Sequence, residues 1–266
     1  MDSIAALRKS EGNRAAMIEF IRVTTYNIHK GLSSLNRRMV VHEVRERLSA
    51  IGADVVFLQE VLGEHEQHAQ RFLDWPSEPQ HEFLAGEEWA DFAYGKNAIY
   101  EGGHHGNAIL SRFPIVRWDN EDISAHRLES RGLLHCEIDV PGWRQPLHCV
   151  NVHLGLAARW RRRQLEALRK RIERLVPQDA PLVIAGDFND WRRQASMELV
   201  AGLRVHEAFE TYRGRPARSF PAALPVFALD RIYVRGFRVR HARVHHGEVW
   251  AKLSDHAALS ATLVKL

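Results

Sequence analysis

The segment PLVIAGDFND, residues 181–190, joins a short apolar run to three polar side chains. Its apolar part predicts a buried strand, because a short apolar run bounded by turn-forming residues is typical of a sheet interior. The run ends in Asp187, Asn189 and Asp190. Since Asp and Asn also favour turns, these residues alone would fit an ordinary turn after a strand. Whether they carry chemistry depends on what stands at the ends of the other predicted strands.

The same pattern, an apolar strand beside a polar side chain, recurs along the chain. About ten strands are predicted, over 20–27, 54–59, 108–110, 114–118, 133–140, 146–154, 181–188, 231–234, 237–244 and 259–266. About four helices are predicted, the clearest over 39–51, 64–74 and 157–176. The other polar residues at or beside strand ends are Asn27, Glu60, Asn107, His153, Asp230, Asp255 and His256. In layered α/β proteins such residues meet at one sheet edge and line a cleft.

The order of these elements predicts the fold class. Some strands follow one another closely, as in antiparallel sheets, and others flank helices. This mixture favours an α/β fold in which two mixed sheets pack face to face with helices outside. No segment has the composition of a linker, so we expect one catalytic domain over 19–266, preceded by an N-terminal extension over 1–18.

Composition limits the class of protein. The chain has 266 residues, of which 45% are hydrophobic, so it is long and apolar enough for a sizeable core and is not globally disordered. Its net charge of +4 permits an anionic partner without identifying one. No apolar run is long enough to cross a membrane, and residues 1–17 lack the apolar centre of a signal peptide. We therefore expect a monomer with no transmembrane segment and a cytoplasmic location.

The cysteines and histidines do not form a recognisable zinc motif. Cys136 and Cys149 lie in strand-like runs and are expected to be buried free thiols, with a single disulfide as the alternative. The sequence contains 16 His but no CxxC or HExxH spacing. The pairs 104–105 and 245–246 are therefore expected in loops or at the surface. The basic triplet at 161–163 is expected on a solvated helix face, with anion binding as the alternative.

The residue types at the strand ends suit hydrolysis assisted by a divalent metal. Mg²⁺ prefers oxygen ligands and uses one or two carboxylates, a role that fits Glu60 and Asp255. A water nucleophile must be oriented and deprotonated, which fits Asp187 and His256, while Asp230 would fix the tautomer of the imidazole ring. Amides and imidazoles hold phosphate oxygens; the candidates are Asn27, Asn189 and His153. Because GxSxG is absent, direct attack by water is favoured over a covalent intermediate.

Seven short motifs, taken together and in order, resemble the endonuclease/exonuclease/phosphatase superfamily, which includes DNase I and exonuclease III. They are TYNI (25–28), LQE (58–60), GNAILSR (106–112), NVHLG (151–155), GDFND (186–190), LDRIYV (229–234) and SDH (254–256). Each motif is weak alone, but the set is specific and covers residues from about 20 to 266. The resemblance implies a four-layered α/β sandwich and a phosphoesterase that depends on Mg²⁺ or Mn²⁺.

The resemblance also implies roles for individual residues. Glu60 matches the principal metal ligand, with Asn27 and Asp255 beside it. Asp187 and Asn189 match the pair that orients water and phosphate, and His256 and Asp230 match a His–Asp dyad. His153 matches a phosphate-binding or acid histidine, and Arg131 matches a phosphate-contacting arginine. Whether Asp187 or His256 is the general base is left open.

Three further residues are candidates for substrate contact. His29 and Lys30 follow the TYNI motif beside the expected metal cleft. Asn107 begins the apolar run of the GNAILSR motif, where it either binds substrate or only closes a turn. Arg131 has a similar alternative as an ordinary charge at a strand edge.

The substrate class is less well defined than the reaction. LQEVL at 58–62 departs from the LQETK of exonuclease III-like repair enzymes, and FALDRI at 227–232 departs from the WCDR-type motif of inositol phosphatases. We therefore expect a phosphodiesterase that acts on nucleic acid or on a phospholipid-type head group, both of which stay open as partners. The alternatives are a phosphomonoesterase on a small metabolite and, remotely, a phosphate-binding module without catalysis.

Overall fold

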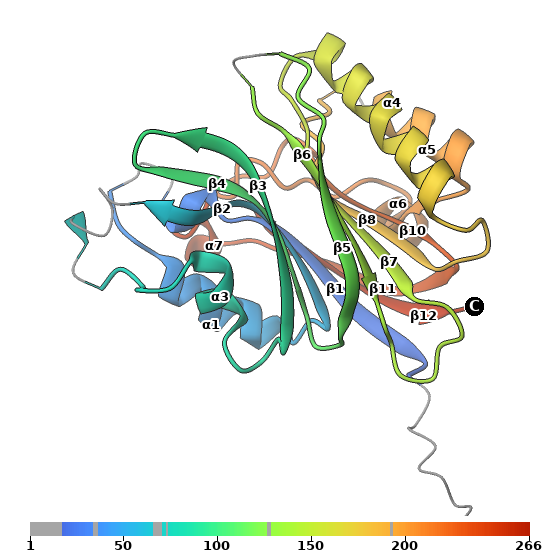
Figure 1. Ribbon diagram of the computed structural model, residues 1–266, viewed down its shortest axis with the longest axis horizontal. Helices are drawn as coiled ribbons and strands as arrows, with labels where there is room; N and C mark the ends of the chain where they lie inside the picture. The colour runs from blue at the N-terminus through green and yellow to red at the C-terminus, as the bar shows by residue number, and fades with distance from the viewer. Residues whose placement is uncertain (1–17, 34–36, 66–70, 73, 127–128, 192–193) are drawn as a thin grey trace, which may run out of the picture.

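The computed structural model describes residues 18–33, 37–65, 71–72, 74–126, 129–191 and 194–266. Twelve strands form two six-stranded mixed sheets, which pack face to face with helices on both outer sides (Figure 1). The predicted α/β sandwich is therefore confirmed. Residues 1–17 of the expected N-terminal extension lie outside the described residues, and the domain boundary at 18–19 stays a prediction.

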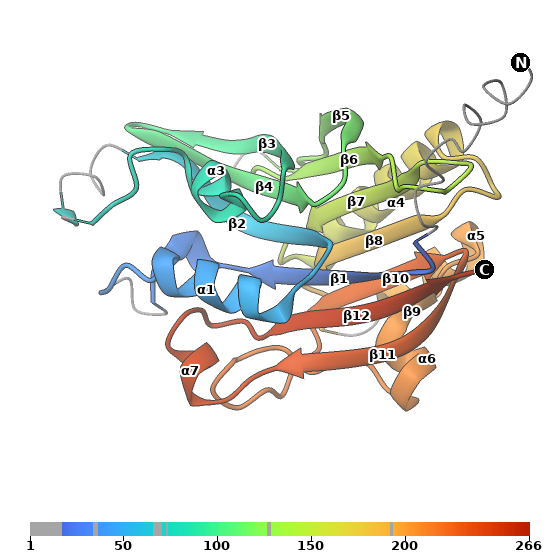
Figure 2. The same ribbon diagram turned by 90° about the horizontal axis from the view of Figure 1, so that it is seen from below.

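The first sheet combines strands from both ends of the chain. In order across the sheet it contains β11 (Phe237–His245), β12 (Ala258–Lys265), β1 (Phe20–Asn27), β2 (Val55–His65), β4 (Gly103–Ser111) and β3 (Asp91–Tyr100). β1 and β2 are parallel, whereas β12 pairs antiparallel with both β1 and β11. Figure 2 shows β12 between β1 and β11.

The second sheet comes from the middle of the chain. Its order is β5 (Ile115–Asp122), β6 (Gly132–Ile138), β7 (Leu147–His153), β8 (Leu182–Asp187), β10 (Asp230–Arg235) and β9 (His206–Glu207). β7 and β8 are parallel, so His153 and Asp187 lie opposite each other at their ends. β8 and β10 are antiparallel, which places Asp230 opposite Asp187.

Three apolar layers hold the sandwich together. The central layer lies between the sheets and joins Val23, Phe57 and Ile109 of the first sheet to residues such as Leu134 and Val183 of the second. The outer layers lie beneath the helices. The α-helices whose bounds lie within the described residues are α1 (Val41–Ile51), α3 (Gln80–Ala85), α4 (Ala158–Leu175), α5 (Gln194–Leu203), α6 (Ala208–Arg213) and α7 (Glu248–Ala251). Because both sheet faces are covered, the strand ends are where polar side chains can gather.

Helix α1 illustrates how sequence fixes an element. Val41, Val44, Leu48 and Ile51 recur at helical spacing, and all four are buried against the first sheet. The helix ends at Gly52, whose φ of 64° is the left-handed conformation that terminates helices and that glycine adopts without strain.

The helix predicted over 64–74 is wrong at its start, where residues 64 and 65 belong to a strand, whereas Arg71 is helical. Strand β2 continues through Glu64 to His65, because it pairs with the long hairpin strand β4 as far as Gly103. Residues 66–70 and 73 of that prediction lie outside the described residues. The structure also contains elements that the apolar pattern did not predict, chiefly α3, β3, α5 and α6.

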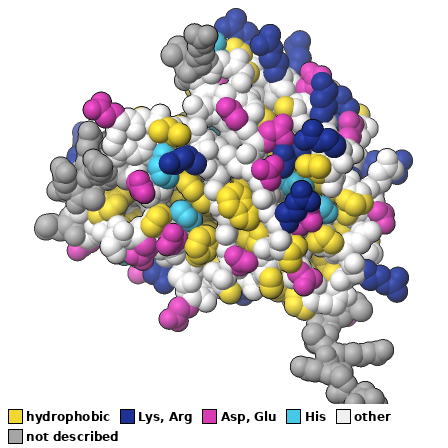
Figure 3. Space-filling model, viewed as in Figure 1, with side chains coloured by type: hydrophobic (Ala, Val, Ile, Leu, Met, Phe, Trp, Pro, Cys, Tyr) yellow, Lys and Arg dark blue, Asp and Glu magenta, His cyan; other side chains and the backbone are white. Residues whose placement is uncertain are grey.

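Helix α4 is less uniformly solvated than its sequence suggests. Arg162 and Arg163 are exposed as expected, and Lys and Arg side chains gather on the surface over α4 (Figure 3). Arg161 and Arg171 are instead buried. Arg171 pairs with Asp119 and Glu121 of β5, while Arg161 donates to the backbone oxygens of Gly155 and Leu156. Two arginines of the basic face therefore fix the helix to the rest of the protein.

The two cysteines are free and buried, as expected. Cys136 and Cys149 lie opposite each other on β6 and β7. Burial raises the pKa of both thiols, so they stay protonated near neutral pH.

None of the described helices is long and apolar enough to span a membrane.

Candidate active site

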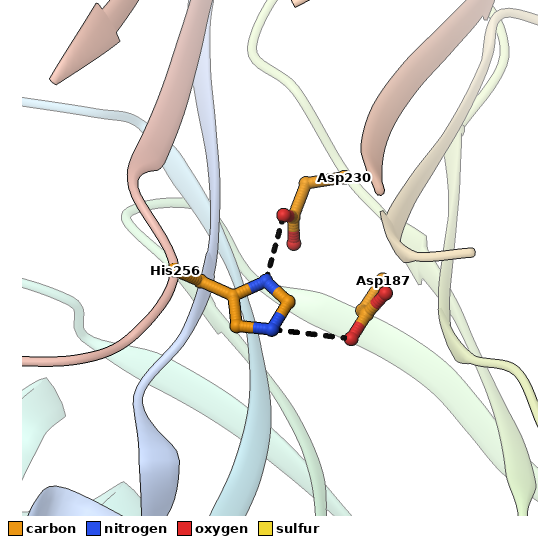
Figure 4. Close-up of side chains that lie close together, drawn as sticks. All are labelled: Asp187, Asp230 and His256. Atoms are coloured by element: carbon orange, nitrogen blue, oxygen red, sulfur yellow. Dashed lines mark hydrogen bonds and ion pairs between the residues drawn. The ribbon is translucent and has the colours of Figure 1, made fainter. Parts of the chain in front are cut away.

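Three buried side chains from separate segments meet at one end of the sandwich. Asp187 ends β8, Asp230 begins β10, and His256 lies in the turn before β12 (Figure 4). Nδ1 of His256 lies 2.8 Å from Oδ2 of Asp230, and Nε2 lies 3.7 Å from Oδ2 of Asp187. The imidazole ring therefore bridges two carboxylates, the arrangement that orients a catalytic histidine.

Backbone contacts hold this turn in place. The hydroxyl of Ser254 donates to the backbone oxygen of Asn27 at 2.7 Å and accepts from the backbone N–H of His256 at 3.1 Å. The N–H of Ala257 donates to the backbone oxygen of Ser219 at 2.7 Å. The turn that carries His256 is thus fixed from both sides, to the end of β1 and to the segment before β10.

Asp187 is the centre of the hydrogen-bond network. Its Oδ2 accepts from Nδ2 of Asn27 at 3.3 Å, and its Oδ1 accepts from the backbone N–H of Asn189 at 2.9 Å. Nε2 of His153 lies 3.5 Å from Oδ2. The amide of Asn189 is held in turn, because its Nδ2 donates to the backbone oxygen of Leu154 at 2.9 Å. Five of the predicted catalytic and metal-site residues other than Asp187 therefore lie in direct contact with it or one contact away: Asn27, His153, Asn189, Asp230 and His256.

Burial and charge give these groups unusual proton affinities. Burial raises the pKa of the Asp187 carboxyl, and the neighbouring Asp230 charge adds to this, although the His256 ring opposes it. Burial alone would lower the pKa of His256, but the Asp230 and Asp187 carboxylates outweigh it and raise the pKa. Burial, followed by the charges of Arg131 and His256, lowers the pKa of His153. The site thus contains one histidine that holds its proton and one that stays neutral.

The predicted metal ligands lie beside this network. Glu60 sits at an irregularity of β2, where the pairing with β4 shifts between Leu58 and Val61. It directly follows Gln59, which pairs with Asn27 of β1. Asn27 Oδ1 accepts from the backbone N–H of His29 at 3.1 Å, and the partly exposed Asp255 adjoins His256. Within the described part of the chain, the Glu60 carboxylate has no hydrogen-bond or ion-pair partner.

These oxygens fit a divalent ion. The proposed donors, which are the partly exposed Glu60 carboxylate, the Asn27 amide oxygen and the Asp255 carboxylate, are of the oxygen type that Mg²⁺ prefers. The atoms of Asp187, Asp230 and His256 also lie within 4.8 Å of one another, so they form a second group that could hold an ion. The residue types at Glu60 therefore suit one divalent ion, and Asp187, Asp230 and His256 form a separate group that could also hold one.

The predicted substrate-contact residues divide into two kinds. The charges of Lys30 and Arg131 both lower the pKa of His153, so both face the site. Arg131 is largely buried; its guanidinium donates to the backbone oxygen of Ser130 at 3.1 Å and makes a longer contact, 3.4 Å, to Glu129. Asn107 is fully buried and donates to the backbone oxygen of Gly132 at 3.1 Å, which ties β4 to β6. Asn107 therefore lies within a strand and does not close a turn, and its contact with substrate stays a prediction.

Strained backbone concentrates at the site. The non-glycine residues with positive φ among those described are His29, Lys30, Glu60, Asn189 and Arg204. The first four belong to the candidate site. Because such conformations cost of order 1–3 kcal/mol each, they persist where the surrounding structure enforces them. The concentration at this end of the sandwich is typical of a functional centre.

One residue near the site was not predicted. His105 was expected in a loop or at the surface, but it lies on β4, two residues before Asn107 and on the same inner face. Its Nδ1 is buried without a hydrogen-bond partner in the described structure. Burial, followed by the charge of Lys30, lowers its pKa to about 4, while the Glu60 charge opposes this. Its signal in the sequence was its two-residue spacing from Asn107.

Gln59 and Asn151 were likewise not predicted. They lie between the sheets, where Gln59 Nε2 donates to Asn151 Oδ1 at 2.8 Å. Asn151 Nδ2 donates to the backbone oxygens of Leu58 and Ala108. This polar bridge fixes β7 of the second sheet to β2 and β4 of the first, directly beneath the site.

The four-layered sandwich with a His–Asp pair at one end defines the class of protein. Residues 24–256 match the Endonuclease/Exonuclease/phosphatase family, and the chain belongs to this family. It is 44% identical over 242 residues to the uncharacterized protein YbhP of Escherichia coli K12, a match that covers 91% of this chain and 95% of that protein. The resemblance found in the sequence motifs is thereby confirmed.

Solved structures share the fold at low sequence identity. An endonuclease/exonuclease/phosphatase from Beutenbergia cavernae aligns with a TM-score of 0.72 and 20% identity, over 93% of this chain and 72% of that one. Humanized D. rerio TDP2 aligns with a TM-score of 0.69 and 20% identity, over 92% of this chain and 99% of that one. The mannosyl-6-phosphatase Bt3783 of Bacteroides thetaiotaomicron aligns with a TM-score of 0.67 and 16% identity, over 92% of this chain and 99% of that one.

Proposed function

We propose that this protein is a phosphoester hydrolase that depends on Mg²⁺ or Mn²⁺, and specifically a phosphodiesterase in which water attacks phosphorus in line. The observation that carries the proposal is the His256 ring held between the Asp230 and Asp187 carboxylates. Such a pair can place and move one proton in a water-poor pocket. Family membership supports phosphoester hydrolysis in general.

The metal site would be built on Glu60. The residues proposed to hold the ion are Glu60, Asn27 and Asp255, all of which supply oxygen. When bound, the ion would supply positive charge that polarises the phosphate and offsets the charge that develops during attack.

The remaining residues would handle water, proton and phosphate oxygens. Asp187 would orient the attacking water, and Asp230 holds the His256 ring in one orientation. Asn189 and His153 would donate to non-bridging oxygens, since the Asn189 amide is already fixed by Leu154. Asp187 would take the proton from water while the protonated His256 ring stabilises the phosphate. In the alternative, His256 would take the proton, which requires its ring to be neutral beforehand.

Two structures with this fold support different substrate classes. One structure of D. rerio TDP2 is described as a complex with a single-strand DNA product, which supports a nucleic-acid substrate. The Bacteroides thetaiotaomicron protein is described as a mannosyl-6-phosphatase, which supports the alternative of a phosphomonoesterase on a small metabolite. We favour the diester because the residues proposed to contact phosphate include one arginine and one lysine, Arg131 and Lys30, rather than an arginine cluster. A lipid head group and a cytoplasmic monomer stay predictions.

A substrate panel tests the proposal. Bis-p-nitrophenyl phosphate, p-nitrophenyl phosphate, sugar phosphates, plasmid DNA, RNA and sphingomyelin are incubated with Mg²⁺, with Mn²⁺ and with EDTA. We expect metal-dependent cleavage that prefers the diester, its loss in His256→Ala, and its retention in the matched control His241→Ala, which removes an exposed histidine. If no phosphoester is cleaved and no metal binds, the protein is a binding module instead.

A further inference from the structure

A second hollow lies away from the His–Asp pair, at the edge of the first sheet. It has a volume of about 630 Å³ and lies between α6, the following segment 215–225, the end of β11 and Trp250 of α7. Figure 2 shows α6 and α7 beside β11 on the outer side of the molecule. Its volume falls within the range of roughly 300–1,000 Å³ that is typical of sites for small organic ligands.

The charge of this hollow is one-sided. We call it the basic hollow and define it by Arg213, Arg215, Arg218, Arg243, His245 and Trp250. As far as the structure describes its lining, no Asp or Glu takes part. The guanidinium groups of Arg215, Arg218 and Arg243 have no hydrogen-bond or ion-pair partner among the described residues. Some exposed arginines elsewhere pair with carboxylates, as in Arg38 with Glu43 and Arg169 with Glu173.

Two further groups of the basic hollow are held in fixed positions. Arg213 donates to the backbone oxygen of Ala242 at 2.9 Å. Nε2 of His245 lies 2.8 Å from the hydroxyl of Ser260. Burial, followed by the charge of Arg243, lowers the pKa of His245 to about 4, and the nearby Arg22, His241 and His246 add to this effect. The region thus carries positive charge that the protein itself does not neutralise.

Part of the lining is apolar and aromatic. Phe209 and Ala217 are buried, and the Trp250 ring makes an edge contact to Tyr26 at 5.6 Å and a tilted contact to His245 at 5.4 Å between ring centroids. Guanidinium groups bind phosphate with paired hydrogen bonds, and a fixed aromatic wall suits a ring. The lining therefore suits a ligand that has both phosphate and a ring.

We propose that the basic hollow binds a free phosphorylated organic molecule of nucleotide size, with its phosphates on Arg215, Arg218 and Arg243 and its ring against Trp250. The site is separate from the catalytic centre, but the same segment forms part of both. Arg218 precedes Ser219, whose hydroxyl accepts from the N–H of Asp230 at 3.2 Å. The Phe220 ring lies 5.0 Å from the His256 ring.

Calorimetric titration tests this binding without any measurement of hydrolysis. ADP and inorganic phosphate are titrated in EDTA into the wild type, into the double variant Arg215→Gln/Arg218→Gln, and into the matched control Arg238→Gln. Arg238 is an exposed β11 arginine outside the hollow. We expect ADP to bind at least tenfold more tightly than phosphate, the double variant to lose at least tenfold in ADP affinity, and the control to change less than twofold.

Three outcomes would overturn the proposal. One is ADP affinity in the double variant equal to that of the wild type, provided that thermal melting shows both to be folded. Another is loss of ADP binding in Glu60→Gln, which would place the ligand at the catalytic centre. The third is displacement of ADP by a ten-nucleotide single strand at lower concentration than free nucleotide, which would assign the hollow to a nucleic acid. Arg243→Gln, which alters β11 instead of the segment 215–225, provides a second variant with the same expected loss.

Discussion

The Nδ1 atom of His256 lies 2.8 Å from Oδ2 of Asp230, and both side chains are buried. This contact fixes which ring nitrogen faces the reaction, because a nitrogen that donates to Asp230 leaves Nε2 directed at Asp187. The pair joins two segments 26 residues apart, so it depends on the fold rather than on a local turn.

Asp230→Asn should reduce turnover by about 10²–10⁴-fold, the range typical of a lost acid–base group. The amide keeps the shape of the side chain but removes the charge that orients His256. The measurement is the steady-state rate on bis-p-nitrophenyl phosphate, with thermal melting to show that the variant is folded. Asp139→Asn, at an exposed position, is the control. A variant as active as the wild type would remove the pair from the mechanism.

Glu60→Gln should weaken Mn²⁺ binding by about tenfold or more, because it removes the negative charge of the proposed principal metal ligand. Calorimetric titration measures this without reference to any substrate. Glu46→Gln, which alters an exposed helix residue, should bind as the wild type does. EDTA should abolish hydrolysis and excess Mg²⁺ should restore it. Unchanged Mn²⁺ affinity in Glu60→Gln would direct attention to the group formed by Asp187, Asp230 and His256 instead.

Arg171→Met should lower the free energy of unfolding by about 1 kcal/mol, because it removes the ion pairs that the buried guanidinium makes with the partly exposed Asp119 and Glu121. Arg163→Met, on the exposed side of the same helix, should change it by less than about 0.5 kcal/mol. Urea unfolding of the two variants gives the comparison. An equal change in unfolding free energy for the two variants would mean that the buried Arg171 contributes no more to stability than the exposed Arg163.

His81→Phe should make the protein less sensitive to acid. Burial lowers the pKa of His81 to about 4 from its ordinary value of 6.5, so between these values the unfolded chain binds a proton that the native protein does not. Stability from this group is complete above pH 6.5 and is lost as the pH falls towards 4. Phenylalanine keeps the ring stack on Tyr94 and does not titrate.

Urea unfolding at pH 7 and pH 5 measures the effect. From the pKa difference, the wild type should lose about 2 kcal/mol more than the variant over this interval. A parallel decline in both proteins would show that His81 is protonated in the native state.

The sequence predicted best where a polar residue stands at or beside either end of an apolar strand. Asp187, Asp230 and His256 were all found this way, because strand ends at one edge of a sandwich converge whatever the details of packing. His105 was missed because its approach to the site depends on how β4 pairs with β2, which a single sequence does not specify. The left-handed backbone of Glu60 was equally unpredictable, since it follows from an irregularity between two strands.

The elements that were missed share a physical cause. α3 has only six residues, and β3 is half-exposed along its length, so neither shows a clear apolar period.

Arg161 and Arg171 were placed on a solvated face because their burial depends on partners outside the helix. Arg161 contacts the backbone after β7, and Arg171 contacts β5. The spacing of apolar residues predicts that a charged side chain is exposed, because the sequence does not show which residue will pair with it in the fold.

The position of β12 between β1 and β11 has a consequence for assembly. The first strand of the fold receives one of its two neighbours only from the last, and His256 lies just ahead of that last strand. A chain cut short before residue 258 would leave β1 with a bare edge and β11 with no strand beside it. The candidate active site therefore acquires its shape only when the two ends of the domain have come together.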